Sequence, residues 1–253
     1  MTGLSLTVLG CCGTYAGAGG ACSGYLLRTE ATTIWVDCGP GTLANVQEHV
    51  ALTDLDALVI SHSHPDHWLE LPVLANALRY GVDAKDLGLR LLWTQRNAEL
   101  MARLGGSKLA PTFAPEVVAD GATASVGDVE LRFARTDHPV ETLAVRADSG
   151  GRSIAYSADT GPRWALTSLG DGVDLAVLEA TLDEHEAGQV QHLTGRQAGR
   201  IAAEGGARSL LLTHLAPGTD PARRAAEAAE AFDGPIEVAE THRTYVAGGT
   251  PQP

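Results

Sequence analysis

The sequence has no concentration of positive charge. It contains 18 lysines and arginines against 31 acidic residues, which gives a formal net charge of −13, and its densest basic pair is Arg223-Arg224, flanked by alanines. A long polyanion such as tRNA needs a basic patch to bind, so this composition argues against tRNA as a partner. A small anionic substrate is still allowed, because bound metal cations can invert the local field.

Cysteine is scarce and irregularly spaced. The four cysteines are Cys11, Cys12, Cys22 and Cys38, and they form no CxxC pair, which argues against a zinc site built on thiolates. We expect reduced, buried thiols in a cytoplasmic protein. A metal-ligand role for one of them is the weaker alternative.

Long apolar runs are also missing. None approaches the roughly 18 residues that a membrane-spanning helix needs, and the start, MTGLSLTVLGCCG, lacks the basic beginning and long apolar stretch of a signal peptide. We therefore expect a cytoplasmic protein without membrane association. With 253 residues, 44% of them hydrophobic, the chain is large enough for one full core. We expect a single domain over 1–253, with a frayed tail at about 247–253.

The hydrophobic pattern predicts a strand-rich chain with roughly five helices. Strands are predicted at 4–9, 25–27, 33–36, 57–61, 89–93, 123–126, 129–134, 143–146, 153–157, 174–178, 209–213 and 236–238. Helices are predicted at about 42–49, 68–80, 96–104, 194–203 and 221–231. This is too many strands for a doubly wound α/β sheet, so two sheets packed face to face with helices outside are expected.

Metal-binding side chains are concentrated in one short motif. The stretch Ser61–His67, SHSHPDH, holds three of the nine histidines and one aspartate, directly after the apolar run Ala57–Ile60. A loop just beyond a strand end is rigidly anchored yet open to solvent. A solvated polar loop without function is the alternative, but this spacing favours a metal site.

The spacing within this motif allows two metals to be bound. In an extended chain His62 and His64 point to the same side, because side-chain direction has a period of two, so both rings can reach one metal at about 2 Å. Pro65 then turns the chain. Asp66 and His67 can therefore face a second metal nearby.

One loop cannot complete two metal shells, and three more polar residues stand at predicted strand ends. They are His138 in RTDHP, Asp159 in SADTG and His214 in LLLTH. Each has an ordinary structural alternative when taken alone: a turn residue, a helix cap and a hydrogen-bonded strand-end histidine, respectively. Strand ends can gather at one edge of a sandwich, however, and this shared position favours a common site.

The pattern therefore predicts two metal sites that share a carboxylate. Imidazole and carboxylate groups suit Zn²⁺, Mn²⁺ and Fe²⁺, and a metal pair about 3.5–4 Å apart can activate water and stabilise the attacking and leaving oxygens together. We assign His62, His64 and His138 to one metal, Asp66, His67 and His214 to the other, and Asp159 to the bridging position.

These motifs, SHSHPDH, DHP, SADTG and LLLTH, resemble in their order the metal motifs of the metallo-β-lactamase fold. The resemblance runs from LTVLG to LLLTHLAP, which is most of the chain. It implies an α+β fold, a four-layer αββα sandwich of two mixed β-sheets flanked by helices. It also implies a hydrolase that depends on two divalent metal ions, with zinc the first candidate and Mn or Fe as alternatives.

Further motifs resemble one branch of that superfamily. The stretch HLTGRQAGRIAAEGG before LLLTHLAP, and the glycine-rich start LTVLGCCGTYAGAGGACSGYLL, are similar to the tRNase Z-like phosphodiesterases. The combination of GYLL, SADTG and HLTG most resembles the actinobacterial cyclic-nucleotide phosphodiesterases of that branch. The resemblance also suggests a homodimer.

The branch carries a histidine that is not a metal ligand at the start of HLTG, here His192. The resemblance implies that this residue stabilises the transition state or protonates the leaving oxygen, and that Asp66 and His192 are the catalytic residues. From the residues alone, His192 only precedes a helix N-terminus, a position that favours anions. Glu179, in LEAT, is a candidate partner that orients His192, with structural packing or a helix cap as alternatives.

Three other histidines are expected to lie outside the site. His185 stands in the acidic stretch DEHEAG and is interpreted as a surface residue. His49 and His242 are interpreted as a helix-face residue and a tail residue, respectively.

The expected reaction is hydrolysis of a small phosphodiester such as a 3′,5′-cyclic nucleotide. Twenty residues separate His138 from Asp159, and the two strands predicted there leave no room for the arm with which tRNase Z enzymes grip tRNA. The alternatives are a tRNA 3′-processing endonuclease-like enzyme, a lactone or thioester hydrolase, and a non-catalytic metal-dependent sensor. The glycine-rich loop at 10–24 either helps to hold the phosphate through its backbone N–H groups or is a flexible surface loop.

Overall fold

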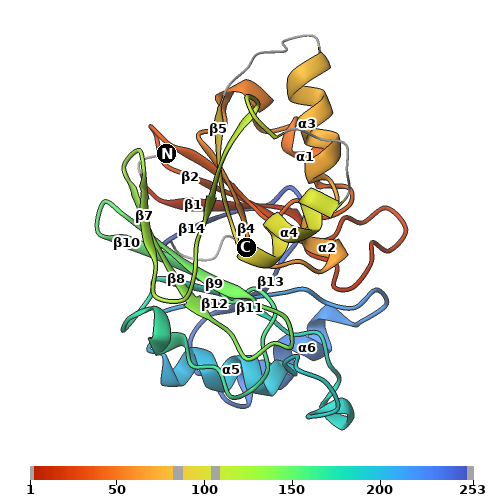
Figure 1. Ribbon diagram of the computed structural model, residues 1–253. Helices are drawn as coiled ribbons and strands as arrows, with labels where there is room; N and C mark the ends of the chain where they lie inside the picture. Colours follow the sequence, from red (N-terminus) through yellow and green to blue (C-terminus); the bar gives the residue numbers. More distant parts are fainter. Residues whose placement is uncertain (1–2, 82–87, 104–108, 250–253) are drawn as a thin grey trace.

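Two seven-stranded sheets form the centre of the computed structural model, which describes residues 3–81, 88–103 and 109–249 (Figure 1). The first sheet contains β1 (Ser5–Gly10), β2 (Gly24–Arg28), β3 (Thr33–Val36), β4 (Ala57–Ile60), β5 (Leu89–Trp93), β6 (Phe113–Val117) and β14 (Thr244–Val246). Their order is β14-β1-β2-β3-β4-β5-β6. The sheet is mixed: β3 to β6 are parallel, whereas β14, β1, β2 and β3 pair antiparallel.

The second sheet is mixed in the same way. It contains β7 (Thr123–Val126), β8 (Val129–Arg135), β9 (Leu143–Ser149), β10 (Arg152–Tyr156), β11 (Leu175–Glu179), β12 (Leu210–Thr213) and β13 (Ile236–Val238). Their order is β13-β12-β11-β10-β9-β8-β7. Strands β7 to β10 pair antiparallel, and β10 to β13 are parallel.

Helices cover the outer faces of both sheets (Figure 1). The first sheet is covered by α1 (Thr42–Val46), α2 (Pro65–Trp68), α3 (Leu71–Tyr80) and α4 (Gln95–Arg103), with the 3-10 turn η1 (Leu52–Asp54) nearby. The second is covered by α5 (Gly195–Glu204), α6 (Pro221–Ala229) and the 3-10 turn η2 (Leu166–Leu169), and η3 (Glu184–Glu186) lies in the loop before α5. This arrangement confirms the predicted αββα sandwich. No helix within the described ranges has the length and apolarity to cross a membrane.

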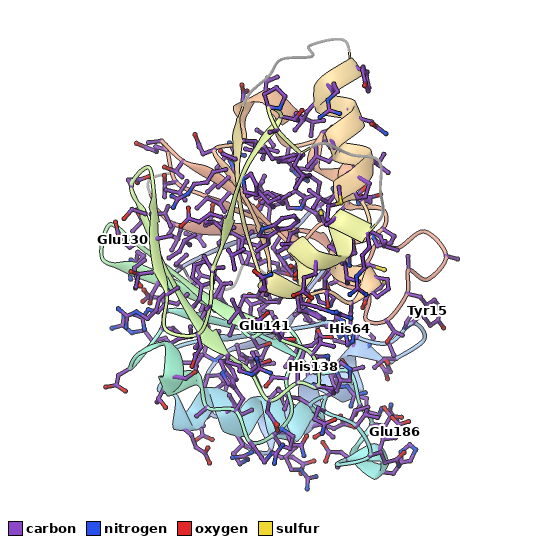
Figure 2. The ribbon with its side chains drawn as sticks, in the orientation of Figure 1. Tyr15, His64, Glu130, His138, Glu141 and Glu186 are labelled. Atoms are coloured by element: carbon purple, nitrogen blue, oxygen red, sulfur yellow. The ribbon has the colours of Figure 1, made fainter. Side chains whose placement is uncertain are left out.

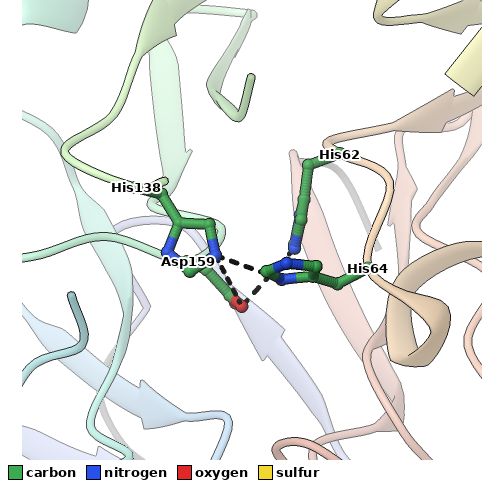
Figure 3. Close-up of side chains that lie close together, drawn as sticks. All are labelled: His62, His64, His138 and Asp159. Atoms are coloured by element: carbon green, nitrogen blue, oxygen red, sulfur yellow. Dashed lines mark hydrogen bonds and ion pairs between the residues drawn. The ribbon is translucent and has the colours of Figure 1, made fainter. Parts of the chain in front are cut away.

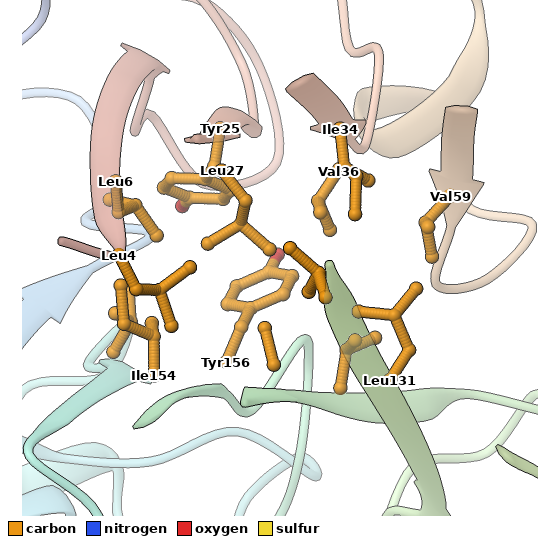
Figure 4. Close-up of a cluster of buried hydrophobic side chains, with 14 of the residues drawn as sticks. Leu4, Leu6, Tyr25, Leu27, Ile34, Val36, Val59, Leu131, Ile154 and Tyr156 are labelled. Carbon is orange, nitrogen blue, oxygen red and sulfur yellow. The ribbon is translucent and has the colours of Figure 1, made fainter. Parts of the chain in front are cut away.

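The main core lies between the sheets, where apolar residues from the inner faces of both sheets meet. Figure 4 shows Tyr25 of β2 and Tyr156 of β10 within this core, with ring centroids 4.8 Å apart. Both rings bury their hydroxyl groups, and both hydroxyls have partners: Tyr25 contacts the Thr213 hydroxyl at 2.6 Å, and Tyr156 donates to Asp37 at 3.0 Å. The core therefore extends up to the ends of the strands that carry the site.

Two edge strands were not predicted, and both close the first sheet. In β6, four of the five residues are exposed and one is Pro115, so the strand lacks the alternation that identifies a half-buried strand. Proline has no N–H to donate and is tolerated at a sheet edge. Strand β14 has only three residues, and its pairing with β1 joins the two ends of the chain.

Some predicted boundaries also change. The first helix ends at Val46 instead of reaching 49, and the helix predicted from Trp68 begins at Leu71, because Trp68 ends the separate short helix α2. The capping box predicted at Thr194 is present. Leu104 and the tail residues 250–253 lie outside the described residues. The described part of the expected tail includes Ala247, which is buried and donates its N–H to the Leu4 carbonyl.

Candidate metal centre

The C-terminal ends of strands from both sheets meet at one edge of the sandwich. Strands β3 and β4 are parallel in the first sheet, and β10, β11 and β12 are parallel in the second. Strand β8 has the same direction as β10, because each is antiparallel to β9. The loops after β4, β8, β10 and β12 therefore bring their polar residues to a common edge.

The first set of histidines combines His62 and His64, after β4, with His138, after β8 (Figure 3). His64 Nδ1 lies 3.1 Å from His138 Nε2. His62 Nε2 and His138 Nε2 lie 3.5 and 3.9 Å, respectively, from Oδ2 of Asp159. One potential ligand atom from each of these four residues lies within 4.8 Å of the others, so the set offers three imidazole nitrogens and one carboxylate oxygen.

The second set combines Asp66 and His67, in α2, with His214, after β12. His214 Nε2 lies 3.2 Å from Oδ2 of Asp66 and 3.3 Å from His67 Nε2. His67 Nε2 lies 3.6 Å from the same Asp66 oxygen. His214 has a positive φ of 56°, a strained backbone conformation for a non-glycine residue that often marks functional positions.

Asp159 lies between the two sets and faces both. Its Oδ1 lies 3.2 Å from His67 Nε2 and 3.4 Å from His214 Nε2, whereas its Oδ2 faces His62. Asp159 Oδ1 and His62 Nε2 are buried yet have no hydrogen-bond partner, which is rare for buried polar atoms. A buried carboxylate oxygen and a buried ring nitrogen that lack a partner are suited to bind a metal, and the cluster is able to bind metal ions.

Burial and charge prepare these side chains for a cation. Burial lowers the pKa of His62 to about 4, which keeps the ring in the neutral form that binds metals. Burial opposes charge on His67 as well, but the carboxylates of Asp159 and Asp37 together outweigh it and raise the pKa of His67 well above its usual range. Burial also opposes ionisation of Asp66, yet the hydrogen bond from His214 and the charges of His67 and His214 together hold the pKa of Asp66 below its usual range. The negative field that favours a proton on His67 also attracts a metal cation.

A buried carboxylate behind the site, Asp37, fixes His67. Asp37 Oδ2 lies 2.7 Å from His67 Nδ1, and it also accepts hydrogen bonds from the Ser61 hydroxyl and from Tyr156. A carboxylate on the far nitrogen of a ligand histidine orients the ring and leaves the other nitrogen for the metal. This contact was not predicted from the sequence. The position of Asp37 directly after the apolar strand β3, like that of the other site residues after their strands, is the signal that could have identified it.

His192 is held by Glu179, the partner that the sequence offered as a candidate. His192 Nδ1 lies 2.8 Å from Oε1 of Glu179, which is fully buried at the end of β11. The other carboxylate oxygen accepts a 2.7 Å hydrogen bond from Thr181, whose hydroxyl lies 2.8 Å from Nδ1 of His214. Burial lowers the pKa of His192, but Glu179 more than offsets this, and the pKa rises to about 9. One carboxylate therefore orients both His192 and a residue of the second set.

A cavity of about 370 Å³ opens onto these groups. It is lined by Thr14, His64, Pro65, Asp66, Asp159, His192 and His214. Figure 2 shows His64 close to His138, and Tyr15 of the glycine-rich loop at the right of the view. The Thr14 N–H donates to Asp66 Oδ2 at 2.8 Å, so this loop contacts the site but uses one of its N–H groups on a residue of the second set.

Other candidate residues lie elsewhere. His185 is exposed in η3, beside Asp183 and Glu186, as expected for a surface residue. All four cysteines are free; Cys22 and Cys38 are buried, whereas Cys11 and Cys12 are only partly buried. Within the described part of the chain, no cysteine joins a group of potential metal ligands.

The two-sheet sandwich and its His/Asp cluster define a class, the metal-dependent hydrolases of the metallo-β-lactamase fold. The chain belongs to the family of the beta-lactamase superfamily domain, whose model matches residues 32–215.

Named relatives agree with this class. The protein Rv1339 of Mycobacterium tuberculosis, which is uncharacterized, is 34% identical over 95% of this chain and 91% of its own length. The probable metallo-hydrolase YhfI of Bacillus subtilis is 29% identical over 94% of this chain and 98% of its own length. The crystal structure of YhfI covers 96% of this chain and 98% of its own, with a TM-score of 0.88 and 27% identity. A ribonuclease Z of Salinispora arenicola is 28% identical over 86% of this chain and 88% of its own length.

Proposed function

We propose that the protein is a phosphodiesterase that binds two divalent metal ions, with zinc the first candidate, and cleaves a small phosphodiester such as a 3′,5′-cyclic nucleotide. The observation that carries the proposal is the position of Asp159, whose two carboxylate oxygens face different sets of ligands. A carboxylate shared in this way is what a dinuclear site requires. The nitrogen and oxygen donors on either side of it suit zinc, and also manganese or iron.

The seven residues of the two sets would hold the metals. A bound metal pair supplies an activated water molecule and neutralises charge on the oxygens around phosphorus. Asp159 would take the bridging position, and Asp66 would be held toward the second metal by the Thr14 N–H. The residues behind the ligands, Asp37 and Thr181, keep the ring nitrogens of His67 and His214 directed into the site.

His192 is the proposed general acid. Its Nδ1 is occupied by Glu179, so Nε2 is the nitrogen left to face the cavity that His192 lines. The carboxylate keeps the ring protonated at neutral pH, and a protonated ring can donate to the oxygen that leaves phosphorus. A general acid of this kind favours displacement at a phosphodiester, where the leaving alkoxide needs a proton.

The surroundings of the site favour a small substrate over tRNA. The residues between His138 and Asp159 form the paired strands β9 and β10 within the second sheet, and the chain carries a net charge of −13. A relative is named ribonuclease Z, so cleavage of an RNA phosphodiester is the alternative. A lactone or thioester hydrolase is a second alternative, because the same metals can activate water against an acyl carbon.

A substrate panel separates these activities. The metal-loaded protein is incubated with bis-p-nitrophenyl phosphate, cyclic AMP, a homoserine lactone and a precursor tRNA, with and without a chelator. We expect chelator-sensitive turnover of the first two and none of the lactone or the tRNA. Turnover of the lactone alone, or of the tRNA alone, would overturn the proposal.

A matched pair of histidine variants tests the proposed acid. His192→Ala should lower phosphodiester turnover by about 10²- to 10⁴-fold, the usual contribution of a general acid, with its metal content unchanged. His185→Ala, which removes an exposed histidine outside the cavity, should keep full turnover. Loss of metal in the His192 variant would show that His192 is a ligand and not the acid.

A further inference from the structure

Two histidines that are distant in the sequence meet on the surface away from the candidate metal centre. His49 lies in the turn after α1, and His242 lies in the loop between β13 and β14. The distance between His49 Nε2 and His242 Nδ1 is 3.0 Å. Neither residue lines the cavity of the candidate centre, so the contact is separate from the proposed reaction.

The geometry of this pair matches a histidine pair inside the candidate metal centre. In the surface pair the ring centroids are 5.2 Å apart and the planes make an angle of 35°. For His67 and His214 the centroids are also 5.2 Å apart and the angle is 32°, with 3.3 Å between the facing nitrogens. Two imidazoles that bind one tetrahedral ion at about 2.1 Å place their nitrogens roughly 3.4 Å apart. A small rotation of the two rings would therefore bring both nitrogens to binding distance from one ion.

A carboxylate is available beside the pair. Glu48 Oε2 lies 3.9 Å from His242 Nδ1, and its side chain is 67% exposed. The ligand atoms of Glu48, His49 and His242 do not all lie within 4.8 Å of one another, so the exposed Glu48 side chain would turn toward His49 to complete the set. Two imidazoles and a carboxylate are a common ligand set for zinc, and they also suit nickel and copper. Solvent can reach the remaining coordination positions, because the His242 side chain is 39% exposed.

Backbone hydrogen bonds fix the main chain at both histidines. The His242 N–H donates to the Val8 carbonyl at 2.7 Å, and the His49 N–H donates to the Val46 carbonyl at 3.0 Å. His242 also has a positive φ of 71°, a conformation that costs free energy in a non-glycine residue and persists only where the surroundings enforce it. The two histidines are therefore presented by fixed backbone, and binding an ion has to order only their side-chain torsions.

We propose that His49, His242 and Glu48 form a surface site for one divalent transition-metal ion, distinct from the candidate metal centre. An ion there would connect the turn after α1 to the loop before β14, the strand that pairs with β1 at the edge of the first sheet. The ligand atoms are His49 Nε2, His242 Nδ1 and a Glu48 carboxylate oxygen, and water completes the shell.

Metal counting on tag-free protein tests the site. Zinc-loaded wild type, His49→Gln, His242→Asn and the control His185→Asn are titrated with Ni²⁺, and the ions retained per chain are measured by mass spectrometry. Asparagine is used at 242 because it tolerates a positive φ. We expect the wild type and the control to retain one more Ni²⁺ than either site variant, with equal zinc content and equal phosphodiester turnover in all four proteins.

Equal Ni²⁺ retention in all four proteins would overturn the proposal and leave the contact as a simple hydrogen bond. If His242→Asn does not fold, as judged by circular dichroism, His49→Gln decides the question alone. Because the readout is the number of bound ions, it does not depend on which substrate the enzyme cleaves.

Discussion

The variant Glu179→Gln should separate the effect of the charge on the Glu179 carboxylate from the effect of its shape. The carboxylate is fully buried and accepts hydrogen bonds from His192 and from the Thr160 N–H on one oxygen, and from Thr181 and the Leu193 N–H on the other. Glutamine has nearly the same volume but only one accepting oxygen, and it is neutral. The variant therefore removes the main cause of the raised pKa of His192.

The size of the effect follows from that pKa. Glu179 raises the pKa of His192 to about 9, and without the charge we expect it to fall toward the ordinary value of about 6.5, a difference of roughly 3 kcal/mol. A general acid works only while protonated, so activity is present below the pKa and is lost as pH rises through it. At pH 8 the protonated fraction would fall about 30-fold in the variant, whereas at pH 6 both proteins would be mostly protonated.

The assay is turnover of cyclic AMP, whose leaving alkoxide needs a proton, by the metal-loaded proteins between pH 6 and pH 9, with metal content measured in parallel. We expect the ratio of wild-type to variant kcat to rise about 20-fold from pH 6 to pH 8. A ratio that stays constant across this range would refute the reasoning, because it would mean that Glu179 only supports the structure. Loss of metal from the variant would instead locate the effect at His214, through Thr181.

Two further substitutions test the supports of the site. Asp37→Asn should weaken metal binding by about 10- to 100-fold, because it removes the charge that fixes His67. Competition with a chelator measures the metal affinity, and an unchanged affinity would contradict the role of Asp37 in orienting His67. In Gly13→Ala the new Cβ would lie 2.6 Å from the His214 carbonyl oxygen and 2.8 Å from Nδ1 of the His214 ring, so His214 would have to move. Because displacement of catalytic groups by even 1 Å is costly, this variant should lower turnover about tenfold or more. Gly19→Ala is the matched control: its Cβ meets nothing within 4 Å, so it should cost about 1–2 kcal/mol of stability through its positive φ but leave kcat unchanged. Equal turnover in the two glycine variants would rule out a role for the Gly13 contact.

Local patterns in the sequence were sufficient to locate the cluster. The three histidines of SHSHPDH are close in sequence, and His138, Asp159 and His214 each follow an apolar strand. Because β8, β10 and β12 run in the same direction, their following loops reach the same edge. A rule about strand ends was therefore enough to bring these residues together.

The supporting contacts could not be found in the same way. Asp37 reaches His67 because β3 and β4 are neighbours, and it reaches Tyr156 through the packing of the two sheets. Thr181 meets His214 because β11 and β12 are neighbours. Such contacts depend on which strands pair, and no local pattern encodes this pairing. The His49–His242 contact has the same origin, since it follows from the return of the chain to β1 through β14.

The central claim is that Asp159 joins two metal ions, and the most direct measurement is a crystal structure of the metal-loaded protein with anomalous scattering collected at the metal edge. We predict two peaks about 3.5–4 Å apart, each within bonding distance of Asp159, with His62, His64 and His138 on one ion and Asp66, His67 and His214 on the other. A single peak in the cluster, or two peaks with Asp159 bound to neither, would contradict it.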